Sequence, residues 1–97
     1  MADCKSWIRQ VPLELNAYVP VIAPCACNYF AIVDCGPDAV MRSSDPTNPE
    51  AEYQMSAHAG YALIGPSLYF RRFEPGEIVT WLKSLGGVGP AVVEFTL

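Results

Sequence analysis

The sequence contains little charge. Only 16% of its 97 residues are Asp, Glu, Lys or Arg, against about 25% in an ordinary soluble domain. The six basic residues form no run longer than two, and the net charge is −4, so the chain lacks the basic stripe that follows a nucleic-acid backbone. No apolar stretch approaches the length of a membrane span. We therefore expect neither a nucleic-acid partner nor a membrane partner.

Reactive groups are also scarce. His58 is the only histidine, and the arrangement Ser56-x-His58 is not a nucleophile motif. Glu74 and Glu77 flank a turn, where the deep cleft that paired glycosidase acids need is not expected. Residues 86–90 are rich in glycine, but a strand pattern follows them and they carry no Lys-Ser/Thr, so they do not form a phosphate loop. The sequence predicts that the protein is not an enzyme and has neither catalytic nor cofactor-binding residues.

The start of the chain lacks the regions of a signal peptide, so we expect synthesis and folding in the cytosol. The cysteines are therefore predicted to be reduced thiols that act as small core residues. Disulfides and zinc are the alternatives, but this spacing does not offer the Cys-x-x-Cys pairs of most zinc sites. The loop at 43–50 has oxygen donors, yet their spacing matches no calcium loop of the EF-hand type. We expect no metal. The cysteines are Cys4, Cys25, Cys27 and Cys35.

Apolar residues, by contrast, make up 52% of the chain. They occur in strand-length runs separated by Gly and Pro turns. Residues 91–97 alternate between apolar and more polar positions, as in a strand with one face more deeply buried. Pro75-Gly76 has the order of a type II turn. Repeated runs at spacings of about ten residues predict an all-β fold, a single-domain sandwich or jelly-roll-like small barrel of seven to eight short antiparallel strands.

The pattern also predicts where the strands and the core lie. Residues 1–10 precede the periodic pattern and are predicted to form an N-terminal arm, and residues 11–97 form the sandwich domain. The expected strands are 13–22, 27–35, 39–42, 52–58, 61–64, 68–73, 78–85 and 91–97. One helical turn is the alternative for residues 52–58. A helix is the alternative for residues 78–85, where Val79, Thr80 and Trp81 favour a strand. The expected core residues are Phe30, Ile32, Leu63, Trp81, Val93 and Phe95.

The apolar content is larger than so small a domain can hide. A chain of this length buries only about two thirds of the surface that its unfolded form exposes, so we expect a partner to cover the remainder. Trp7 and Ile8 stand outside the periodic body, and the strand at 29–33 is apolar on both faces. The candidate interface residues are Trp7, Ile8, Tyr29, Tyr69, Arg71 and Arg72.

Several segments resemble, in the same order, small all-β accessory proteins of tailed bacteriophage particles. They are residues 72–83, with their Arg-Phe-Glu-Pro-Gly-Glu-Ile-Val-Thr-Trp-Leu-Lys, residues 87–93, residues 27–33, the loop at 42–46 and Pro66. The resemblance implies a structural protein of the virion, such as a capsid cement or decoration protein, that assembles in the host cytoplasm. The implied partners are further copies of the chain, in a dimer or trimer, and a major capsid or other virion protein. It implies no catalytic residue.

A module that binds a carbohydrate or another small ligand is the alternative. Coplanar, exposed aromatic rings in a monomer would favour it, whereas a buried polar pocket around His58 would favour an enzyme. The rings that could form such a platform belong to Tyr18, Tyr53, Tyr61, Tyr69 and Trp81.

Overall fold

A computed structural model of the protein describes residues 6–27, 29–64 and 73–96. These residues contain eight strands and one short 3-10 helix. In chain order the elements are β1 (Ser6–Val11), β2 (Val19–Ile22), β3 (Tyr29–Asp34), β4 (Val40–Ser43), η1 (Pro49–Ala51), β5 (Glu52–Met55), β6 (Tyr61–Ile64), β7 (Ile78–Ser84) and β8 (Ala91–Thr96). No helix in this part of the chain has the length and apolar character needed to cross a bilayer.

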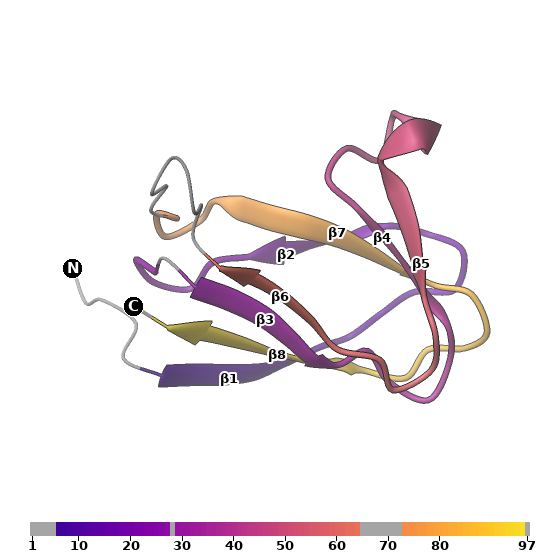
Figure 1. Ribbon diagram of the computed structural model, residues 1–97, viewed down its shortest axis with the longest axis horizontal. Helices are drawn as coiled ribbons and strands as arrows, with labels where there is room; N and C mark the ends of the chain where they lie inside the picture. The colour runs from indigo at the N-terminus through magenta and orange to yellow at the C-terminus, as the bar shows by residue number, and fades with distance from the viewer. Residues whose placement is uncertain (1–5, 28, 65–72, 97) are drawn as a thin grey trace.

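The eight strands form two four-stranded antiparallel sheets. The first sheet has the order β1-β8-β3-β6 and the second has the order β2-β7-β4-β5. Every connection except that from β4 to β5 passes from one sheet to the other, and Figure 1 shows β1 and β8 on one side of the molecule and β7 on the other. The predicted all-β sandwich, with its single domain and its number of strands, is confirmed.

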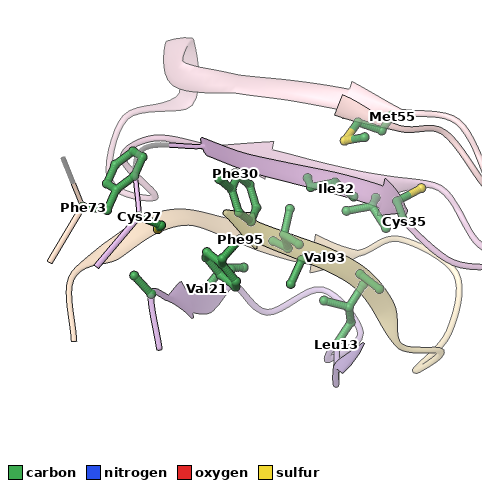
Figure 2. Close-up of a cluster of buried hydrophobic side chains, with 14 of the residues drawn as sticks. Leu13, Val21, Cys27, Phe30, Ile32, Cys35, Met55, Phe73, Val93 and Phe95 are labelled. Atoms are coloured by element: carbon green, nitrogen blue, oxygen red, sulfur yellow. The ribbon is translucent and has the colours of Figure 1, made fainter. Parts of the chain in front are cut away.

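The core lies between the two sheets. Phe30 and Phe95 are directly opposite each other on β3 and β8, with ring centroids 5.2 Å apart, and Figure 2 shows them in the middle of the cluster. Ile32 and Val93 form the next inward pair along the same two strands. All four side chains are buried. The alternation of residues 91–97 thus marks the buried face of β8 correctly, and four of the predicted core residues are confirmed.

Trp81 was expected in the core, and this prediction is wrong. Its neighbour Leu82 is fully buried, whereas Trp81 is only partly buried and pairs in register with Pro20 and Ser43. Successive residues of a strand point to opposite faces, so β7 can place only one of the two inward. The small residues Thr80 and Ser84 share the face of Leu82, and the large aromatic ring is left on the other face. The side chain of Leu63 lies outside the described part of the structure.

The predicted strand at 13–22 is too long. Only Val19–Ile22 forms β2, while Leu15 makes an isolated bridge to Ser84 and is exposed. Asn16 has a positive φ of 57°, a left-handed conformation that interrupts an extended chain. The turn around Asn16 separates the buried Leu13 from β2.

Residues 6–10 of the predicted arm do not lie apart from the sandwich. Residues 1–5 lie outside the described part of the chain. Ser6–Val11 is strand β1, which pairs along its whole length with β8, from Ser6 opposite Thr96 to Val11 opposite Ala91. The strand crosses the expected boundary between residues 10 and 11 and belongs to the first sheet. Its sequence lacks a clean alternation because an edge strand is only partly covered on both faces.

The turn at Pro75-Gly76 has the predicted form. Gly76 has a φ of 88°, and the Glu77 N–H donates a hydrogen bond to the Glu74 carbonyl at 3.0 Å. These are the features of a type II turn. Of the expected strand at 68–73, only Phe73 lies in the described part of the chain, where it bridges to Cys27.

Candidate interaction surface

Trp7 and Ile8 are the most prominent apolar residues of the edge strand β1. Trp7 is 44% exposed and Ile8 is 64% exposed. Trp7 pairs with the buried Phe95, so its ring lies on the inward side of the first sheet, at the rim of the sandwich. Ile8 pairs with Glu94 and lies on the outward side. The Arg9 guanidinium lies 5.2 Å from the centroid of the Trp7 ring. Adjacent apolar side chains are therefore open to solvent on both sides of one strand.

The other exposed large apolar residues are more dispersed. Ile22 and Ile78 pair in register at the end of the second sheet, and the rest come from separate strands and loops. Isolated exposed apolar side chains are normal on soluble proteins. The full set besides Trp7 and Ile8 is Leu15, Ile22, Val33, Tyr53, Ile78 and Val88.

Of the remaining candidate interface residues, one is partly buried and three lie outside the described residues. Tyr29 lies in β3, opposite Thr96 of β8, and is partly buried on the outward face of the first sheet. Ala31, two residues further along that face, is buried. Tyr69, Arg71 and Arg72 lie outside the described residues, so their place in an interface stays a prediction.

A polar cluster lies at the second sheet. The Tyr18 hydroxyl donates a hydrogen bond to Glu52 Oε2, and Lys83 Nζ lies 3.7 Å from the same oxygen and 4.5 Å from the Tyr18 ring centroid. Burial, followed by the hydrogen bond to the Glu52 carboxylate, raises the pKa of Tyr18 to about 12. The three groups satisfy one another, which makes this cluster a structural contact.

Arg42, on β4, contacts tyrosine rings of both sheets, on the edge strands β5 and β6. Its guanidinium carbon lies 3.7 Å from the ring centroid of Tyr61, on β6, and 4.9 Å from that of Tyr53, on β5. Within the described part of the chain, its buried Nε atom has no hydrogen-bond partner. Cations cover one face of Tyr61, Tyr53 and Tyr18, and these rings come from both sheets. These three rings therefore do not have both faces free for the ligand platform of the alternative interpretation.

Asp34 and His58 form a pair that the sequence did not indicate. His58 Nδ1 lies 3.0 Å from Asp34 Oδ1 and 3.1 Å from Oδ2. The pairing depends on the turn at 56–59, where His58 has a φ of 61° and its backbone N–H donates to the Gly36 carbonyl at 2.8 Å. Both side chains are open to solvent. An exposed pair on a turn does not form the buried polar pocket that would favour an enzyme.

The Asp34 pair predicts a pH-dependent contribution to stability. The hydrogen bond from the Gly36 N–H at 2.8 Å, followed by that from His58, lowers the pKa of Asp34 below its ordinary value of 3.8. A carboxyl whose pKa is lower in the folded state stabilises the fold above its unfolded pKa, and this contribution is lost as the pH falls through the folded pKa. We expect Asp34→Asn to be less stable than wild type at pH 7, with a difference that shrinks below about pH 4.

Thermal unfolding of both proteins between pH 7 and pH 3 measures this difference. A gap between the two melting temperatures that stays constant over the whole range would contradict the role assigned to the Asp34 carboxylate.

The cysteines do not all behave as predicted. Cys25 is disulfide-bonded, so the expectation of four reduced thiols is wrong. Cys27 and Cys35 are buried thiols, and Cys35 Sγ donates to the Ser56 carbonyl at 3.0 Å. Cysteine pairing requires Cα atoms within about 7 Å of each other, a proximity that sequence spacing does not reveal. Cys4 lies outside the described residues.

Two of the oxygen donors of the loop at 43–50, Asp45 and Asn48, accept hydrogen bonds within the loop. Asp45 Oδ1 accepts hydrogen bonds from the backbone N–H and the hydroxyl of Thr47, at 3.0 and 2.7 Å. Asn48 Oδ1 accepts from the Glu50 N–H at 3.0 Å and caps η1. Among the described residues, no group of three or more His, Cys, Asp or Glu side chains is placed to hold a metal ion.

Comparison with protein-family models, with curated proteins and with solved structures finds no match to this chain.

Proposed function

We propose that the protein is a structural component of a virus particle, a capsid cement or decoration protein that stabilises the particle by symmetric association. The role needs surfaces that bind other protein subunits, and it needs no reactive group. The observation that carries the proposal is the pair of exposed apolar side chains, Trp7 and Ile8, on the edge of the first sheet. Burying such side chains against a partner contributes about 1.5–3 kcal/mol for each one that becomes fully covered.

The order of the strands supports the same proposal. We infer that the sandwich is a jelly roll, because the chain alternates between the two sheets and produces the orders β1-β8-β3-β6 and β2-β7-β4-β5. Eight-stranded jelly rolls are common in viral capsid domains and also in lectins. Because the fold alone does not specify a function, the choice between the two depends on the surface. Cations stack on Tyr18, Tyr53 and Tyr61, which leaves the apolar edge as the stronger feature.

The test is the composition of native particles. Particles are purified by density gradient from the cells that produce the protein, and the copies of the chain per particle are counted by quantitative mass spectrometry. We expect a fixed number of copies that is a multiple of the particle's symmetry. A protein that is absent from every particle fraction would remove the virion role.

A further inference from the structure

The four edges of the two sheets differ in how well they are protected against pairing with another strand. The edge strands β2 and β5 are each four residues long, and residues 61–64 of the edge strand β6 are described. β2 also contains Pro20 and a register shift between Val21 and Ile22. Short edges, prolines and bulges are the devices by which proteins block edge-to-edge association. The edges at β2 and β5 therefore resist addition of a strand.

The edge at β1 carries none of these devices within the described residues. It is six residues long, contains neither proline nor glycine, and pairs with β8 without a register shift. Within the described residues, β1 has a neighbouring strand on one side only, and Figure 1 shows it at the lower border of the molecule. Its one charged side chain, Arg9, lies over the Trp7 ring of the same strand. The backbone N–H and C=O groups on its outer side are placed to pair with a further strand.

We propose that β1 pairs antiparallel with β1 of a second copy of the chain, so that the two first sheets join into one eight-stranded sheet across a two-fold axis. This inference deepens the proposed assembly role and rests on it. It assigns the contact to one strand and the partner to an identical chain.

The sequence of β1 is complementary to itself in one register. A two-fold axis perpendicular to the joined sheet places a residue opposite its own copy, and residues directly opposite share a face. With Ile8 on the axis, Trp7 lies opposite Arg9 of the other copy on the inward face, and this pair occurs twice. Arg and Trp already stack within one chain, and cation–π contacts strengthen when they are desolvated. On the outward face, Ile8 meets Ile8.

The neighbouring registers are less favourable. An axis through Arg9 would place two guanidinium groups directly opposite each other, and like charges in that position destabilise a sheet. An axis through Trp7 would pair only Ser6, Trp7 and Ile8 within strand β1. The register centred on Ile8 pairs residues 6–10 without a clash of charge, which is why the proposed occupant of the edge is a second copy.

The first test is the dimer equilibrium of Ile8→Lys, measured by sedimentation equilibrium. Two lysines at the axis would repel each other, and we expect the dimer Kd to rise roughly tenfold or more, the loss that follows when a central interface residue is disrupted. The matched control is Val88→Lys, which adds the same charge at a 72% exposed loop position and should leave the Kd unchanged. Circular dichroism melts of both variants establish that they fold. A monomeric wild-type protein, or a dimer that Ile8→Lys does not weaken, overturns the proposal.

The second test fixes the register. Antiparallel neighbours directly opposite each other have Cβ atoms about 4.5–5.5 Å apart, so Ile8→Cys should form a covalent dimer under mild oxidation, visible on a non-reducing gel. Gln10→Cys would face Ser6 of the other copy and should give no more dimer than wild type. Crosslinking of Gln10→Cys in place of Ile8→Cys overturns the proposed pairing.

The two proposals fail in different ways. If the protein is present in particles and Ile8→Lys dimerises and enters them as wild type does, the β1 pairing is wrong and the virion role stands. If wild type dimerises through β1 but occurs in no particle, the pairing stands and the virion role is wrong.

Discussion

Truncation of Phe95 to alanine is expected to lower the free energy of unfolding by about 3–5 kcal/mol, the range measured for large aromatic truncations in protein cores. Phe95 is almost fully buried, and its ring lies 5.2 Å from that of Phe30, at the junction of β3 and β8. Removing the ring leaves a cavity between the two sheets that rigid strands on both sides cannot close. Because small domains have a total stability of only about 5–15 kcal/mol, the loss is a large fraction. Urea denaturation measures it.

Trp81→Ala is the matched control. It removes a larger aromatic ring, but one that lies on the face of β7 opposite the buried Leu82. A partly exposed ring forms fewer contacts and leaves no enclosed cavity, so we expect a smaller loss of stability than for Phe95→Ala. If Trp81→Ala costs as much as Phe95→Ala, the assignment of the two residues to different faces is wrong.

The parts of the fold that the sequence predicts well are those that depend on local signals. β8 has strict alternation, and the turn at Pro75-Gly76 contains the two residues that its backbone angles require. Local alternation fails for Ser6–Val11, because the position of β1 at the edge depends on its pairing with β8, whose residues are 80 to 90 positions away in the chain. It also fails for β7, where Trp81 and Leu82 compete for one inward position and only the register with neighbouring strands decides between them.

In the candidate site, too, features set by local sequence were predictable, and contacts between distant residues were not. Trp7 and Ile8 could be selected from sequence because two large apolar residues stand next to each other in a segment with polar neighbours. Asp34 and His58 are 24 positions apart, and they meet only because the turn at 56–59 folds back onto Gly36. The stacking of Arg42 on Tyr61 likewise joins strands of different sheets. Contacts of this kind follow from topology, which composition and periodicity leave open.

Gly36 is the residue on which several of these contacts depend. Its φ is 103°, and a Cβ atom added there would lie 2.9 Å from the Pro90 carbonyl oxygen. Its N–H donates to Asp34 Oδ1, and its carbonyl accepts from the N–H of His58. Gly36→Ala should therefore cost about 1–3 kcal/mol for a backbone conformation that L-residues rarely adopt, and about 1–3 kcal/mol more for the forced overlap with the backbone at Pro90.

Gly76→Ala separates the two contributions. Gly76 also has a positive φ, 88°, but an added Cβ would meet nothing within 4 Å. We expect it to lose only the conformational part, so that urea denaturation shows Gly36→Ala to be the less stable of the two by the cost of the overlap. Nuclear magnetic resonance of the His58 ring provides an independent readout. Movement of the Gly36 backbone displaces the Asp34 carboxylate, which contacts the imidazole, whereas a substitution at Gly76 does not. If the two variants are equally stable and the His58 signals are unchanged, the backbone near Pro90 moves aside without a cost in stability. Gly36 is then required only for its positive φ.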